Sequence, residues 1–193
     1  MKIASMFIGI VGPSGAGKST LCKKLKKNSK EYEHIKLDNY FKQSRTFPKR
    51  FGFPNWELPS NLKFNVLLHD LKKLKAGKIV KTKTFPKMKG AKPESLTLRP
   101  KKYILVEGFM LYKNKGIRDF LDRKIYLDIP KEMMIERRKI RFGENHVNEY
   151  DTKVAIPEFL KYGVVQKKYA DKVIDSNKSQ EEILKEVQEI IEG

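Results

Sequence analysis

The sequence contains very little cysteine and histidine. Its 193 residues include one cysteine, Cys22, and three histidines. A single cysteine cannot form an intrachain disulfide, and the histidines lack the spacing of metal ligands. We therefore interpret His34, His69 and His146 as structural residues and expect no zinc site. Long apolar runs are also absent: no stretch reaches the roughly 18 apolar residues that a membrane-spanning helix needs.

We expect no targeting segment at the start of the chain. The first apolar strand begins within a few residues of Met1. This leaves no room for the apolar region and cleavage site of a secretory signal. Together with the single cysteine, this favours a cytoplasmic protein with no membrane partner.

Acidic residues are scarce relative to basic ones. The chain has 42 Lys and Arg against 23 Asp and Glu, a formal net charge of +19 at pH 7. Such a surplus can indicate a nucleic-acid partner. The lysines, however, stand in scattered pairs rather than in one long tract. We favour a lysine-rich surface with a site for a polyanionic nucleotide, and keep a nucleic-acid-associated nucleotide-binding protein as an alternative.

The stretch FIGIVGPSGAGKST, residues 7–20, carries the strongest functional signal. An apolar run with the length of a buried strand is followed by a glycine-rich loop and then by helical spacing. Glycines let successive N–H groups turn toward phosphate oxygens, and the helix adds the positive end of its dipole. Lys18 can reach the β- and γ-phosphates of ATP, and Ser19 can bind Mg²⁺. The predicted nucleotide-binding residues are Gly12, Ser14, Gly15, Ala16, Gly17, Lys18, Ser19 and Thr20.

Strands and helices alternate along the rest of the chain. Strands are expected at 7–11, 34–37, 103–106, 124–127 and 172–174, and helices at 19–30, 61–76, 116–121, 130–142, 156–169 and from Ser179. This alternation predicts a single α/β domain over residues 1–193, a P-loop NTPase-type five-stranded parallel sheet with helices on both faces. Residues 78–100 are expected to form an insertion whose two β-like pieces pair as a small antiparallel flap.

Two acidic residues at the ends of predicted strands can complete a site for phosphoryl transfer. Asp38 follows strand 34–37, where side chains point into the ligand crevice, and can orient or deprotonate an acceptor hydroxyl. Glu107 follows strand 103–106 in the pattern of a Walker B strand and can serve the Mg²⁺ beside Ser19. The alternative for Asp38 is a helix cap or turn residue.

Three arginines on helix 130–142 can form a lid over about residues 137–150. Their charge would stabilise the transferring phosphoryl group. We expect Arg138 and Arg141 to be catalytic and Arg137 to contact the nucleotide. The alternative is an ordinary solvated helix face.

Residues 42–59, which we name the acceptor loop, have no periodicity and are rich in aromatics. An irregular loop of this length usually has a function. Its Phe51, Phe53 and Trp56 can form a stacking wall for a substrate ring or can simply be core residues. Trp56 is counted among the candidate substrate contacts.

In sequence order, these motifs resemble the uridine kinase and phosphoribulokinase family of P-loop kinases. The matching stretches are GPSGAGKST at 12–20, LDNYF at 37–41, NWELP at 55–59, ILVEGFMLY at 104–112, ERRKIR at 136–141 and KYADKVID at 168–175. They cover most of the chain. The D-x-[FY]-[FY] element combined with VEG and the arginines is much more specific than the phosphate loop alone.

The resemblance implies an ATP- and Mg²⁺-dependent kinase that phosphorylates a ribonucleoside 5′-hydroxyl, with uridine or cytidine favoured. It implies that Asp38 is the base, that Tyr40 and Phe41 lie near the nucleoside, that Glu57 contacts the ribose hydroxyls and that Phe85 contacts the base. The sequence leaves open whether the protein forms a homo-oligomer.

The sequence departs from the family pattern in two places. NWELP replaces an NFDHP-like stretch, and residues 85–95 contain no histidine to read a pyrimidine. EGFMLY and the RR-x-x-R spacing also resemble nicotinamide riboside kinases, the nearest alternative. A regulatory P-loop protein that hydrolyses ATP to switch a partner is a third hypothesis, and the acceptor loop argues mildly against it.

Overall fold

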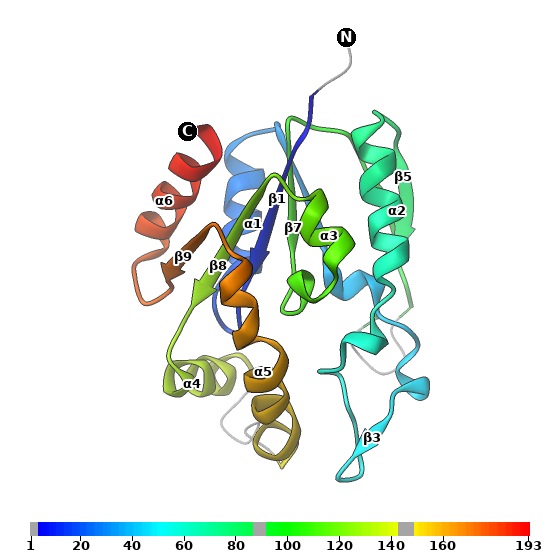
Figure 1. Cartoon of the computed structure of the whole chain (residues 1–193), viewed down its shortest axis with the longest axis vertical. Coiled ribbons are helices and arrows are strands. Elements are labelled where there is room, and N and C mark those ends of the chain that lie inside the picture. The colour runs from blue at the N-terminus through cyan, green and yellow to red at the C-terminus, as the bar shows by residue number, and fades with distance from the viewer. Residues whose placement is uncertain (1–3, 87–91, 143–148) are drawn as a thin grey trace.

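A parallel sheet with helices on both faces forms the centre of the computed structural model, which describes residues 4–86, 92–142 and 149–193 (Figure 1). Its strands are ordered β2-β7-β1-β8-β9. Every neighbouring pair is parallel, which confirms the predicted sheet. The strands are β1 Met6–Val11, β2 Tyr32–Lys36, β7 Tyr103–Glu107, β8 Arg123–Asp128 and β9 Lys172–Asp175.

The two faces of the sheet build two apolar cores. Successive side chains of a strand point to opposite faces, so Phe7 and Val11 of β1 enter one core and Ile8 and Ile10 enter the other. In Figure 1, α1 and α6 lie on the Ile8 side, and α2 and α3 lie on the Phe7 side. The helices are α1 Lys18–Asn28, α2 Phe64–Lys75, α3 Lys115–Phe120, α4 Lys131–Phe142, α5 Ile156–Tyr162 and α6 Gln180–Glu192.

Two small antiparallel pairs form sheets of their own, separate from the main sheet. β5 (Val80–Lys83) pairs with β6 (Ser95–Leu98), which confirms the flap. Within the acceptor loop, β3 (Lys49–Arg50) and β4 (Phe53–Pro54) form a short hairpin. Among the described residues, no helix is long and apolar enough to cross a membrane.

The helix predicted at 156–169 is in fact broken. A π-helical turn over Asp151–Ala155 precedes α5, and a 3-10 helix over Val164–Tyr169 follows it. The break falls at Gly163, where a Cβ atom would lie 2.0 Å from the ring of Phe159. Close contact between this backbone and the ring therefore requires glycine here.

The start of the helix predicted from residue 61 also differs. Neither Ser60 nor Asn61 caps it, because Pro59–Asn61 form a 3-10 turn and α2 begins only at Phe64. Its other end is as predicted: Gly77 follows α2 with a left-handed φ of 78°. The predicted capping box of Ser179 and Glu182 is present at the start of α6.

Candidate active site

The phosphate loop connects β1 to α1 and leaves the start of the helix open. Gly15 and Gly17 have φ values of 90° and 85°, a region that favours glycine. Gly17 is the N-cap residue of α1, and no side chain caps the helix. A Cβ atom on Gly12 would lie 2.3 Å from the carbonyl oxygen of Leu127 in β8. These glycines let the loop turn closely over the sheet and keep helix N–H groups available to an anion.

Lys18 folds back over the loop that precedes it. Its Nζ donates to the carbonyl oxygens of Gly12 at 2.8 Å and Pro13 at 2.7 Å. Of the other predicted nucleotide-binding residues, Ala16 is fully buried and Ser14 is half-buried in the loop, while Thr20 is exposed in the first turn of α1. The ammonium group therefore lies on the loop itself.

Ser19 and Glu107 meet, as the metal-site prediction requires. The Ser19 hydroxyl donates to Glu107 Oε1 at 2.5 Å, linking the first turn of α1 to the end of β7. A hydroxyl and a carboxylate are hard oxygen ligands, which suit Mg²⁺ when phosphates and waters complete the shell. No group of three or more His, Cys, Asp or Glu side chains among the described residues could hold a metal ion by itself.

His34, which we interpreted as a structural residue, also contacts Glu107. Its Nε2 lies 3.1 Å from the same oxygen, Oε1, and both side chains are buried. Burial would raise the pKa of Glu107, but the hydrogen bonds from His34 and Ser19 and the charge of Lys18 lower it to about 2. Glu107 is consequently an anion at neutral pH. No spacing in the sequence pointed to this contact, because His34 and Glu107 belong to different strands.

Asp38 lies in a 3-10 turn, Leu37–Tyr40, that directly follows β2. It is half-buried, and β2 is the neighbour of β7 in the sheet. Two other predicted residues, Glu57 and Arg138, belong to its surroundings, because the charges of Asp38 and Arg138 both act on the Glu57 carboxyl group. Asp38 and Arg138 therefore both lie near enough to Glu57 for their charges to act on it, although the three residues are far apart in sequence.

Tyr40 does not join this group, which corrects its placement near the nucleoside. Its side chain is buried against α2, and its hydroxyl donates to Asp70 Oδ2 at 3.0 Å. The 3-10 turn points Tyr40 into the core while Asp38 stays near the surface of the site.

Tyr40→Phe is accordingly expected to affect stability and not catalysis. The substitution leaves the buried Asp70 without its donor, which should lower the free energy of unfolding by about 1–3 kcal/mol. Urea unfolding measures this loss, and steady-state kinetics should give an unchanged KM for the acceptor. A higher acceptor KM with unchanged stability would contradict the structural role.

Phe41, Trp56 and Phe85 form one aromatic cluster. The Phe41 ring lies 5.4 Å from Trp56 and 5.6 Å from Phe85, measured between ring centroids. Phe47 and Phe109 pack against the same ring. These three residues therefore come together from the turn after β2, the acceptor loop and the flap, and they belong to or pack against the apolar core on the Phe7 side of the sheet, as the core alternative predicted for Trp56. The two other loop aromatics differ: Phe53 packs on Tyr150, and Phe51 is 62% exposed at the hairpin tip.

Two of the three lid arginines make specific contacts rather than facing solvent. Arg137 donates to the carbonyl oxygens of Gly15 at 3.1 Å and Ser176 at 2.8 Å, which ties α4 to the phosphate loop. Arg138 forms an ion pair with the buried Asp151. The structure does not describe the side chain of the third, Arg141. Residues 143–148 of the predicted lid also lie outside the described residues.

The acceptor loop touches the lid side of the molecule through contacts that the sequence did not predict. The Tyr150 hydroxyl accepts from the backbone N–H of Trp56 at 3.2 Å and donates to Glu57 Oε1 at 3.4 Å. Arg50 of the hairpin pairs with Glu158, a buried residue of α5. Glu57 of the acceptor loop is thereby held against Tyr150 of the lid.

Glu57→Gln should remove a pH-dependent loss of stability. Burial is the largest cause that raises the pKa of Glu57 to about 7 from its ordinary 4.5. Between these two values the folded protein holds a proton that the unfolded chain has released, so rising pH destabilises the fold across this window. Melting temperatures from pH 4.5 to 8 should fall less steeply for Glu57→Gln than for the wild type. Parallel curves would show that Glu57 titrates normally.

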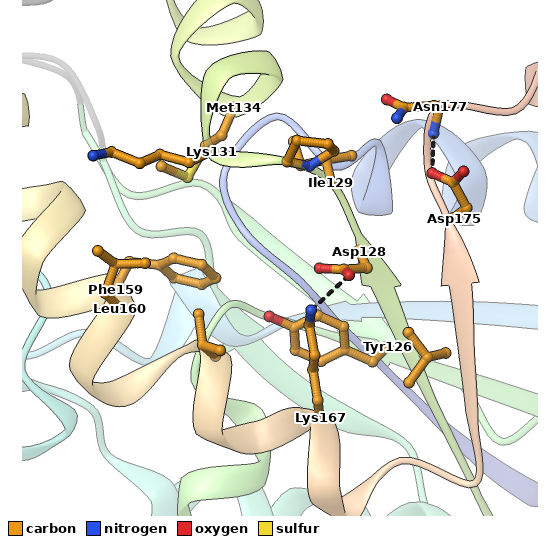
Figure 2. Close-up of a pocket in the computed structure, with 13 residues that line it drawn as sticks. Tyr126, Asp128, Ile129, Lys131, Met134, Phe159, Leu160, Lys167, Asp175 and Asn177 are labelled. Atoms are coloured by element: carbon orange, nitrogen blue, oxygen red, sulfur yellow. Dashed lines mark hydrogen bonds and ion pairs between the residues drawn. The ribbon is translucent and has the colours of Figure 1, made fainter.

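A separate cavity of about 610 Å³ opens at the carboxyl ends of β8 and β9 (Figure 2). Its lining includes an ion pair of 2.6 Å between Lys167 and Asp128, with Phe159 and Met134 on the opposite side. None of the predicted site residues lines it. The predicted residues instead lie in the phosphate loop and the start of α1, at the ends of β2 and β7, in the acceptor loop, after β5 and on α4.

Comparison with known proteins identifies the family. The model of the Phosphoribulokinase / Uridine kinase family matches residues 7–182. The chain belongs to this family. It is therefore a kinase, a nucleotide-binding transferase with the P-loop fold, as the sequence motifs predicted.

Curated relatives match almost the whole chain. It is 32% identical over 187 residues to a uridine kinase of Chlamydia pneumoniae, covering 92% of this chain and 84% of that protein. It is 34% identical over 179 residues to a uridine kinase of Macrococcus caseolyticus, covering 86% of each.

Solved structures support the fold. A possible uridine kinase from Bacillus stearothermophilus has a TM-score of 0.63 at 22% identity and covers 89% of each chain. A putative fructose transport system kinase from Silicibacter has a TM-score of 0.65 at 20% identity, with 89% of this chain and 90% of that one covered.

Proposed function

We propose that this chain is an ATP- and Mg²⁺-dependent kinase of a ribonucleoside 5′-hydroxyl, with uridine or cytidine as the favoured acceptor. The observation that carries the proposal is the 2.5 Å hydrogen bond between Ser19 and Glu107. It joins the phosphate loop to the end of β7, beside the strand that leads into Asp38. The relatives described above, each named uridine kinase, support the class of acceptor.

On the donor side, the chain supplies positive charge and N–H donors for the phosphates. Lys18 would exchange its two carbonyl partners for phosphate oxygens, and the open start of α1 would add N–H groups. Ser19 and Glu107 would hold Mg²⁺. When bound, this ion neutralises charge on the β- and γ-phosphates.

On the acceptor side, Asp38 would act as the general base. It takes the proton of the 5′-hydroxyl while the hydroxyl oxygen bonds to the γ-phosphorus and the bond from the γ-phosphorus to the bridging oxygen breaks. ADP and the nucleoside 5′-monophosphate are the products. Glu57, when ionised, would accept hydrogen bonds from the ribose hydroxyls, and the rings of Phe41, Trp56 and Phe85 would bound the space for the base.

The experiment that tests this function is ADP release with a panel of acceptors. Uridine, cytidine, adenosine and nicotinamide riboside are each supplied with ATP and Mg²⁺, and one reaction contains no acceptor. We expect uridine or cytidine to give the highest kcat/KM. Highest activity with nicotinamide riboside would favour the nearest alternative, and full ADP release without an acceptor would indicate a hydrolase.

A further inference from the structure

His34 and Ser19 bind the same oxygen of the proposed metal carboxylate. Ser19 Oγ and His34 Nε2 lie 2.5 Å and 3.1 Å from Oε1 of Glu107. An ionised carboxylate can only accept hydrogen bonds, so Nε2 of His34 must carry a hydrogen atom and act as the donor. Two donors from different elements, α1 and β2, fix how the carboxyl group is turned.

The strand register explains why His34 reaches this oxygen. Lys36 of β2 is the register partner of Glu107 in β7, and His34 is the partner of Leu105. Residues two apart on a strand share a face, so His34, Leu105 and Glu107 point to the same side of the sheet. This is the side covered by α1, which carries Ser19. A diagonal contact between neighbouring strands is within reach of a long side chain.

The contact is compatible with a cation on Ser19. When its hydroxyl donates to Glu107, the lone pairs of Oγ remain available to a metal ion. His34 then supports the carboxylate without competing for that ion, since its donor points at Glu107. A histidine that only filled the core could be replaced by an apolar residue at no cost to this carboxylate.

We propose that His34 is a positioning residue, which holds the Glu107 carboxylate toward Ser19 and so preorganises the Mg²⁺ site. The inference rests on the proposed use of Mg²⁺ with a nucleotide. Partners of this kind that orient a metal ligand typically change metal affinity by 10–100-fold when removed. His34 acts by orienting the Glu107 carboxylate and does not itself contact substrate or phosphate.

The test measures how strongly Mg²⁺ tightens binding of ADP, by calorimetry with Mg²⁺ and with a chelator. In His34→Leu and His34→Asn the tightening should shrink by about 10-fold or more, while the Kd for metal-free ADP stays unchanged. His34→Gln, whose amide nitrogen reaches as far as Nε2, should restore it. Mn²⁺ binding followed by electron paramagnetic resonance gives a second readout that needs no turnover.

The variants separate a loss of folding from a loss of the positioning role. Thermal melting shows which variants fold, and His34→Asn decides the matter should the leucine variant be unstable. Wild-type tightening in His34→Asn would overturn the positioning role and leave the kinase proposal intact. Normal Mg²⁺-linked ADP binding in the wild type, without phosphorylation of any nucleoside, would instead overturn the proposed function and leave His34 as assigned.

Discussion

Replacing Asp38 by asparagine should lower kcat with uridine by about 10²–10⁴-fold, the usual contribution of general base catalysis. Asparagine has nearly the same shape but cannot take the proton of the 5′-hydroxyl. Because Asp38 follows β2 and not the phosphate loop, the Kd for ATP should stay almost unchanged. Steady-state kinetics and a separate titration with a nonhydrolysable ATP analogue measure the two effects.

Asp119→Asn is a matched control for this experiment. Asp119 lies on α3, is exposed and pairs with Lys115 four residues earlier. The same chemical change there should leave kcat at the wild-type value, since surface ion pairs contribute little. Wild-type turnover of Asp38→Asn on every nucleoside would reject Asp38 as the base.

Lys18→Ala should reduce both donor binding and turnover. The ammonium group lies within the phosphate loop, so its removal takes a positive charge away from the bound phosphates and from the transition state. Loss of one such stabilising donor typically lowers kcat by about 10²–10³-fold. The Kd for ATP should rise as well, which separates this variant from Asp38→Asn.

Lys23→Ala serves as the control on the same helix. Lys23 is an exposed residue of α1, so its removal changes the net charge equally but leaves the loop intact. Equal losses in the two variants would mean that general surface charge, and not the position of Lys18, attracts the nucleotide. A wild-type Kd for ATP in Lys18→Ala would contradict the loop's assigned role.

The sequence predicted the elements whose signals are local. The phosphate loop is a contiguous motif, and the apolar strands and amphipathic helices follow from the spacing of side chains along one segment. The capping box at Ser179 and the stop at Gly77 are local in the same sense, and both are present. The parallel sheet then follows from the alternation of strands and helices.

Sequence patterns could not predict the contacts between distant segments. His34 meets Glu107 only because of the register of β2 and β7, and Tyr150 meets Glu57 across a separation of 93 residues. Tyr40 was misplaced for a different reason. Its motif suggested a shared site with Asp38, but a 3-10 turn separates the directions of the two side chains.

Phosphorus-31 NMR of the reaction of ATP with uridine tests the central claim most directly. A kinase of the 5′-hydroxyl should convert ATP to ADP and yield a new phosphomonoester whose phosphorus couples to the two 5′ protons of the ribose. 5′-Deoxyuridine should give no such signal. Orthophosphate as the only new phosphorus species, formed equally with and without nucleoside, would contradict the account.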